Sequence, residues 1–108
     1  MASAISPQTN EALRLLASSI RVHRLRRNWS IHELAARVGV SHPTIIKLER
    51  GDPRVAVGTV LEAATLVGVP LFDEDPITRS RHEQRLTAEL SLLPQAGRAR
   101  RSQVDDDF

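Results

Sequence analysis

Side chains suited to binding chemistry are concentrated in one short segment of the chain. The segment carries hydrogen-bonding, cationic and methyl-bearing groups on His42, Thr44, Ile46, Lys47 and Arg50. Groups of these kinds bind the base edges and phosphates of nucleic acids. We therefore interpret the segment as a candidate nucleic-acid-binding surface.

The residues around this surface predict two short helices joined by a tight turn. Ser30 is a suitable cap for the first helix, where Glu33 would complete a capping box, and Ser41 is suitable for the second. Gly39 falls where the first helix must end, and Pro43 falls in the first turn of the second. This order is typical of a DNA-binding helix-turn-helix, although an ordinary helical hairpin in a bundle would share part of it.

Helices are also expected before and after this motif. Apolar residues at three- and four-residue spacing predict one helix over residues 10–28 and another over residues 57–67. The residues expected to point inward are Leu13, Leu16, Ala17, Ile20 and Arg24 in the first of these helices, and Val57, Val60, Leu61, Ala64 and Val67 in the second. The core that they form is expected to be plugged by the apolar residues Val69, Leu71 and Phe72.

A last helix is expected over residues 77–93, where Leu86, Leu90 and Leu93 recur at helical spacing. This stripe could pack on its own domain or against a second copy of the chain. We favour the dimer, because the domain is complete by Phe72. The predicted segments are a flexible N-terminus (1–9), a helix-turn-helix DNA-binding domain (10–72), a C-terminal helix for possible dimerisation (73–94) and a flexible basic and acidic tail (95–108).

The charge of the chain is uneven. Residues 14–54 carry nine basic and three acidic residues, a balance of +6, although the net charge of the whole chain is +2. Arg26 and Arg27 near the end of the first helix are suited either to clamp phosphates or to stabilise the helix dipole, and both roles stay open. The chain has no cysteine and no apolar run long enough to span a membrane, so we expect a soluble cytoplasmic protein.

The residues that usually carry catalysis lack the necessary spacing. The four histidines are not paired with carboxylates as metal ligands would be. The sequence also contains neither a glycine loop that cradles phosphate nor a nucleophile elbow. We therefore expect a binding protein and no enzyme, with no cofactor and no metal site.

Residues 20–72 resemble the Cro/repressor-type helix-turn-helix domains. Ala35, Gly39, Ile45 and Leu48 stand where that motif has small, glycine and apolar residues. The resemblance implies an all-α fold, namely a five-helix lambda-repressor-like DNA-binding domain with an added C-terminal helix and a flexible tail. We accordingly expect the protein to bind a double-stranded DNA operator as a homodimer.

The same resemblance assigns roles to individual residues. Arg24 and Glu49 would form a partly buried ion pair between the first and third helices. Arg54 would lie in a loop that touches the DNA backbone, and the positions facing the major groove would be His42, Pro43, Thr44 and Lys47. The full set of residues expected to contact DNA is Ser30, Ser41, His42, Pro43, Thr44, Ile46, Lys47, Arg50, Arg54, Arg26 and Arg27.

The chain departs from the family pattern at three positions. Ile31 stands where a glutamine usually ties the motif to a phosphate, so that anchor is missing, and Ser30 and His32 are the residues that would compensate. Asn28 replaces a glycine but tolerates a left-handed backbone. Ala56 replaces the polar cap usual before the fourth helix.

A second resemblance, to HipB-type antitoxins, covers residues 51–108. It rests on residues 51–55 (Gly-Asp-Pro-Arg-Val), on residues 68–72 (Gly-Val-Pro-Leu-Phe) and on the basic and then acidic tail. It implies a repressor of its own operon that also binds a HipA-like kinase toxin. The residues that would bind this partner are Asp105, Asp106, Asp107 and Phe108. A free-standing regulator without a toxin partner is the alternative.

Overall fold

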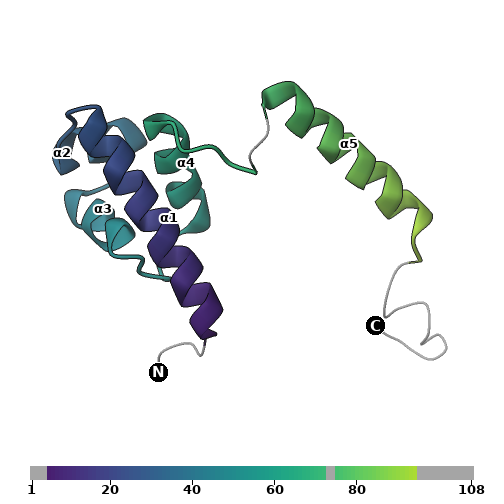
Figure 1. Ribbon diagram of the computed structural model, residues 1–108, viewed down its shortest axis with the longest axis horizontal. Helices are drawn as coiled ribbons and strands as arrows, with labels where there is room; N and C mark the ends of the chain where they lie inside the picture. Colours follow the sequence, from purple (N-terminus) through teal and green to yellow (C-terminus); the bar gives the residue numbers. More distant parts are fainter. Residues whose placement is uncertain (1–4, 73–74, 95–108) are drawn as a thin grey trace. The chain divides into compact units, whose positions relative to one another are not determined.

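The computed structural model of the protein describes residues 5–72 and 75–94. These residues contain five α-helices and no strand (Figure 1). The expected all-α class is confirmed. The chain divides into two compact units, and the boundary between them in the sequence falls between Leu71 and Phe72. Four helices belong to the first unit, whereas the fifth belongs to the second.

The first helix, α1, spans Pro7–Arg26. The Oγ of Ser6 accepts a hydrogen bond from the backbone N–H of Thr9 at 3.1 Å. This cap, with a proline at the first helical position, starts the helix three residues before the expected position 10. The helix stops short of Asn28, because the backbone of Asn28 is left-handed (φ 59).

The next two helices have the boundaries that the sequence predicts. α2 spans Ile31–Val38 and α3 spans His42–Glu49. Gly39 ends α2 with a left-handed backbone (φ 86), and its N–H donates to the carbonyl of Ala35 at 2.8 Å. The expected capping box is half-formed, since the carboxylate of Glu33 accepts a hydrogen bond from Arg37 instead of closing the box.

The fourth helix, α4, spans Val57–Val67 and has no side-chain cap, because Ala56 stands at its N-cap. Its inward face differs from the expected one. Val57 is 73% exposed and Leu61 is 39% exposed, whereas Ala63 is fully buried. Alanine permits the close approach of α4 to α1 and α2, which larger side chains on that face would prevent.

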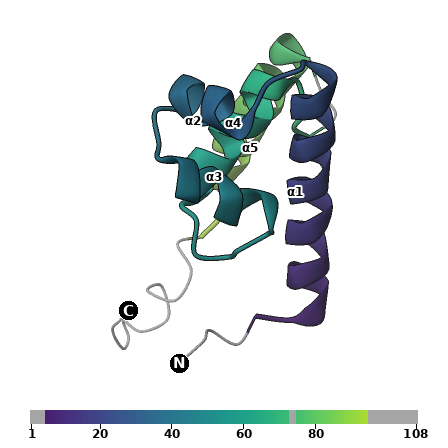
Figure 2. The same ribbon diagram turned by 90° about the vertical axis from the view of Figure 1, so that its left-hand side faces the viewer.

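The core of the first unit lies where the four helices meet. Figure 2 shows α2 and α3 beside α1, and contacts join each of α1 and α2 to each of α3 and α4. The largest fully buried side chains are Ile20, Leu34, Ile45 and Val67. Each contributes about 1.5–3 kcal/mol relative to an exposed side chain, so these four account for much of the drive to pack the helices.

The end of the first unit corrects one expectation. Val69 and Leu71 pack against the core as predicted. Phe72 does not plug the core, since its side chain is 80% exposed. The backbone at Phe72 is left-handed (φ 61), so the chain turns there.

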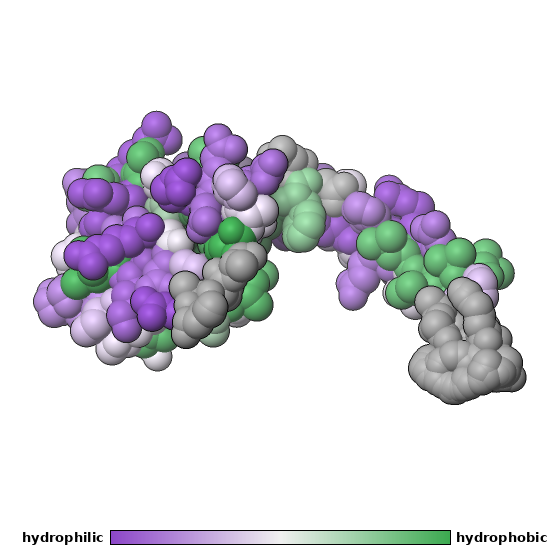
Figure 3. All heavy atoms as spheres, turned by 90° about the horizontal axis from the view of Figure 1, so that it is seen from below, coloured by the Kyte–Doolittle hydropathy of each residue, from purple (hydrophilic) through white to green (hydrophobic). Residues whose placement is uncertain are grey.

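The second unit is built on α5, which spans Pro76–Leu92 and has no buried residue. Asp75 caps the helix by accepting a hydrogen bond from the N–H of Thr78, which lowers the pKa of the Asp75 carboxyl. Figure 3 shows apolar side chains gathered towards the C-terminal half of α5, where Leu90 and Leu92 are exposed. No helix among the described residues is both long enough and apolar enough to cross a membrane.

Candidate nucleic-acid interface

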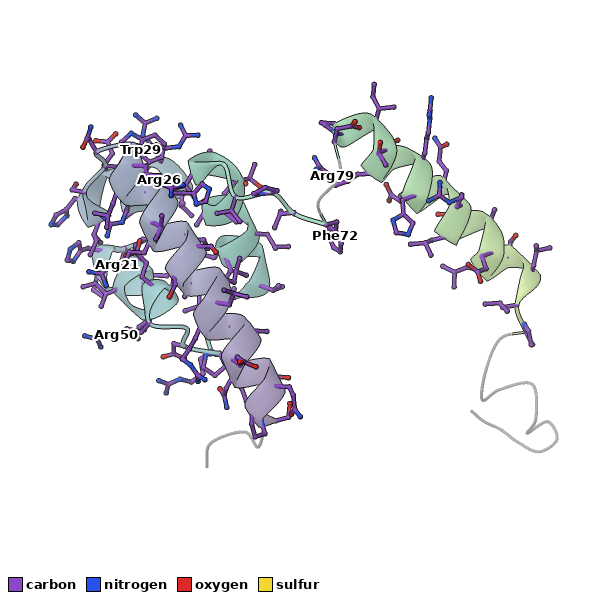
Figure 4. All side chains as sticks on the ribbon, viewed as in Figure 1. Arg21, Arg26, Trp29, Arg50, Phe72 and Arg79 are labelled. Carbon is purple, nitrogen blue, oxygen red and sulfur yellow. The ribbon has the colours of Figure 1, made fainter. Side chains whose placement is uncertain are left out.

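The two faces of α3 differ in character. Ile45 and Leu48 are buried in the core, and the opposite face is polar and cationic. Arg50, which follows the helix, extends outward beside it in Figure 4. The residues expected to meet DNA lie outside the core: Pro43, Lys47 and Arg50 are exposed, and His42, Thr44 and Ile46 are half-buried.

A buried ion pair fixes the C-terminal end of α3 against α1. The Nε of Arg24 donates to Oε2 of Glu49 at 2.7 Å, and its Nη2 donates to Oε1 at 2.9 Å. The Nη1 of Arg24 donates to the carbonyl of Trp29 at 2.8 Å. Since the two side chains are only 6% and 7% exposed, this pair holds α3 at a defined angle to the rest of the unit.

A hollow lies between α3 and the loop that leads to α4. The residues that line it are Val40, Thr44, Lys47, Asp52, Arg54, Val55, Ala56 and Thr59. Thr44 and Lys47 bring hydrogen-bonding groups from α3, and Arg54 brings a second cation from the loop. The hollow is therefore lined on one side by α3 and on the other by the loop that leads to α4.

The charge of Arg54 is largely matched by Asp52 of the same loop. The Nη2 and Nε of Arg54 donate to the two carboxylate oxygens of Asp52 at 2.9 and 3.1 Å, and the backbone N–H of Arg54 also donates to Asp52 at 2.8 Å. The hydrogen bonds from Arg54 hold the pKa of the Asp52 carboxyl at about 2. The carboxylate therefore stays ionised at neutral pH and competes with any phosphate for Arg54.

Arg26 and Arg27 have different surroundings. The Nε of Arg27 donates to the carbonyl of Val67 at 2.9 Å, and its guanidinium lies 5.4 Å from the ring centre of Trp29. Arg27 thus joins the end of α1 to the end of α4. Arg26 is exposed at the end of α1 near Trp29 (Figure 4), and remains suited to a phosphate contact.

Ser30 and Ser41 act as helix caps. The Oγ of Ser30 accepts from the N–H of Glu33 at 3.0 Å. The Oγ of Ser41 accepts from the N–H of Thr44 at 3.3 Å and lies 2.8 Å from the Thr44 hydroxyl. These hydroxyls are at the N-terminal ends of α2 and α3, where backbone N–H groups and the helix dipole favour an anion.

One contact at this surface was missed by sequence reasoning. The imidazole rings of His32 and His42 stack with centres 3.9 Å apart and planes inclined by 16°. His32 lies in the first turn of α2 and His42 begins α3. Only the folded turn brings residues ten positions apart into register, so no local spacing in the sequence reveals this pair.

Four residues expected to bind a protein partner lie outside the described residues. They are Asp105, Asp106, Asp107 and Phe108. The structure therefore provides no test of their role.

Comparison with known proteins identifies the motif. A family model described as helix-turn-helix matches residues 20–73, which is half of the chain. The matched segment contains α2, α3 and α4, and it begins at Ile20 in the second half of α1. No curated protein and no solved structure matches the chain.

Proposed function

Since the chain belongs to the Cro/repressor-type helix-turn-helix family and is a DNA-binding transcription regulator, we propose that it represses transcription at a specific operator. The observation that carries this proposal is the polar and cationic outward face of α3. The helix itself is fixed against α1 by the ion pair between Arg24 and Glu49. Its role is binding in the cytoplasm, where it meets chromosomal DNA, and the proposal includes no catalysis and no cofactor.

The outward side chains of α3 match the groups that the major groove offers. Lys47 is exposed and can donate to O6 and N7 of a guanine. His42 can bind a base edge or a phosphate, and the methyl groups of Ile46 can contact a thymine methyl. Exposed arginines add salt-dependent affinity, because they release counterions from the phosphates.

A two-fold dimer would place two recognition helices in successive major grooves, about 34 Å apart. We assign the dimer contact to α5, where Leu86 and Leu90 form an exposed stripe; Leu93, expected in the stripe, follows the helix as its C-cap residue with an extended backbone. An antiparallel pairing that sets Leu86 beside Leu90 of a second copy also brings Arg85 close to Glu89 of that copy. Charge and apolar pattern thus favour a second copy of this chain on this stripe.

The test of sequence recognition is operator selection from a random duplex library, followed by binding measurements on Lys47→Ala. If Lys47 contacts a base, the variant relaxes the preference at that position by about 1–3 kcal/mol. Arg81→Ala, which removes an exposed cation from α5, serves as the matched control and should leave the preference unchanged. A uniform loss across all duplexes would make Lys47 a phosphate contact. Absence of any salt-sensitive binding to duplex DNA would overturn the proposed function.

The test of the dimer is sedimentation of Leu90→Asp beside Ala88→Asp. A buried aspartate in the stripe should separate the copies and weaken operator binding, since one half-site contact is lost. Ala88 lies two residues from Leu86 and from Leu90, on the opposite side of the helix, so the control should remain dimeric. A dimer that persists in Leu90→Asp would show that α5 is not the interface.

We further propose that the protein is the autoregulating antitoxin of a HipA-like kinase, with the free-standing regulator as the alternative. What supports this is the HipB-type resemblance of residues 51–108. Deletion of residues 95–108 should abolish neutralisation of a kinase encoded by the neighbouring gene and leave DNA binding intact. Undiminished neutralisation after the deletion would exclude a role for the tail.

A further inference from the structure

The stacked imidazoles of His32 and His42 lie in the first turns of two helices that the turn at Gly39 brings together. His32 is exposed and His42 is half-buried, so the edges of the rings are accessible. Neutral imidazole carries one donor and one acceptor nitrogen, whereas the protonated ring carries two donors. The pair is therefore a compact donor group whose charge depends on proton binding.

The two helices that carry the pair supply few free charges close to it. On α2, Glu33 and Arg37 bind one another at 2.9 Å. On α3, Glu49 is bound to Arg24, and Lys47 is exposed five residues after His42. Among the described residues, neither imidazole forms an ion pair with a carboxylate.

The helices packed against α2 and α3 form no ion pair with the rings among the described residues, and the one carboxylate of α1, Glu11, is exposed. α1 meets α3 through Arg24, whose guanidinium is already occupied by Glu49. α4 packs on α2, and its one charged residue, Glu62, is exposed. Within residues 5–72 and 75–94, no carboxylate serves as a counter-charge for the pair, so a bound anion could take that place.

We propose that the stacked imidazoles of His32 and His42 form a binding site for a backbone phosphate of DNA, and that the pair takes up one proton when the phosphate binds. This inference rests on the proposed DNA binding and adds a specific site and a pH dependence to it. The site occupies the first turns of α2 and α3.

Electrostatics explains why proton uptake and phosphate binding are coupled. The positive ends of the α2 and α3 dipoles attract an anion to the first turns that carry the rings. A phosphate at the ring edges favours the protonated form of a ring, because it is an opposite charge within contact distance. A second proton would place two cations 3.9 Å apart in the stack, so one proton per pair is the expected uptake.

The experiment can distinguish the histidine pair from other groups that bind protons. Asp52, with a pKa of about 2, does not titrate near neutral pH. The remaining histidines are His23, whose Nδ1 lies 2.8 Å from the carbonyl of Ser19, and His82 in the second unit. His23→Gln and His82→Gln are therefore the matched controls for replacement of a histidine elsewhere.

The experiment measures the affinity of the full chain for a 24-base-pair duplex of arbitrary GC-rich sequence by fluorescence anisotropy, from pH 6.0 to 8.5 at fixed ionic strength. Uptake of one proton strengthens binding by at most about tenfold per pH unit, and we expect roughly three- to tenfold between pH 8.0 and 6.0. His32→Gln and His42→Gln should each remove this dependence, whereas both controls should keep it. His32→Lys should bind at pH 8.0 about as tightly as the unmodified chain binds at pH 6.0.

Calorimetry of the same duplex in two buffers of different ionisation enthalpy counts the protons directly. Uptake of a fraction of a proton up to one per chain at pH 7, lost in both glutamine variants, supports the site. DNA binding that does not change with pH, or a dependence that survives in His32→Gln and His42→Gln, overturns the site while the proposed function stands. A chain that binds no duplex at any pH overturns both.

Discussion

Removal of Glu49 should strongly destabilise the first unit. In Glu49→Ala, the guanidinium of Arg24 would keep one hydrogen bond, to the carbonyl of Trp29, and would lose both bonds to the carboxylate. A charge that is 6% exposed would then be left without its counter-charge. One-sided loss of a buried pair costs about 3–5 kcal/mol, so the unfolding equilibrium should shift by roughly 10²- to 10⁴-fold.

Urea unfolding followed by circular dichroism at 25 °C measures this change on the full chain. Glu33→Ala is the matched control, since it breaks an ion pair with Arg37 whose side chains are about half exposed. That pair should contribute no more than about 1 kcal/mol. Typical domains are stable by about 5–15 kcal/mol, so Glu49→Ala should be partly unfolded in water if the first unit lies near the lower limit.

A double replacement separates the cost of a lone charge from the value of the pair. Arg24→Met with Glu49→Leu removes both charges and fills a similar volume, so stability should return to near that of the unmodified chain. Specific DNA binding should return with it if the main role of the pair is to position α3. A loss below about 1 kcal/mol in Glu49→Ala would refute the reasoning, because the buried guanidinium would then have found another partner.

Four further changes test the surroundings of individual residues. Asp52→Asn should free Arg54 and strengthen binding to any duplex, with a slope of log K against log salt that is steeper by about 0.9 in anisotropy titrations; an unchanged slope would contradict this. Arg27→Ala should lower the free energy of unfolding by about 1–2 kcal/mol through the lost bond to the α4 carbonyl and leave the salt slope unchanged. Arg26→Ala should leave the free energy of unfolding unchanged and make the salt slope shallower. Equal effects of the two variants on both quantities would contradict the separate roles of the two arginines. Gly68→Ala should cost about 1–2 kcal/mol in thermal unfolding, since Gly68 has φ 89; a neutral result would mean that the backbone relaxes.

The boundaries of α2 and α3 could be predicted because local chemistry determines them. Ser30 and Ser41 satisfy backbone N–H groups within three residues, and Gly39 adopts a backbone that other residues avoid. The inward face of α4 was harder to predict. Val57 and Leu61 mark one apolar face of α4 at helical spacing, and Ala64 and Val67 mark a neighbouring one. The pattern alone therefore cannot decide which face packs against α1 and α2.

The partners of the polar side chains could not be predicted, because they depend on contacts between distant segments. Arg27 bonds to a carbonyl 40 residues away, and the rings of His32 and His42 meet only across the folded turn. The pairing of Arg24 with Glu49 across 25 residues was expected from the family resemblance and from no local signal. Phe72 likewise is an apolar residue of the kind found in protein cores, but its backbone is left-handed and its side chain is exposed.

These contacts reduce the number of cations that are free to meet DNA. Five cations were expected to do so, but Arg27 is bound to α4 and Arg54 is bound to Asp52. Lys47, Arg50 and Arg26 remain exposed and form no ion pair within the described residues. Three phosphate contacts per chain correspond to a salt slope of about −2.7, against about −4.5 for five. Weaker sequence-independent attraction would leave more of the discrimination to the base contacts proposed for α3, and this favours selection of one specific site over the many competing sites of a genome.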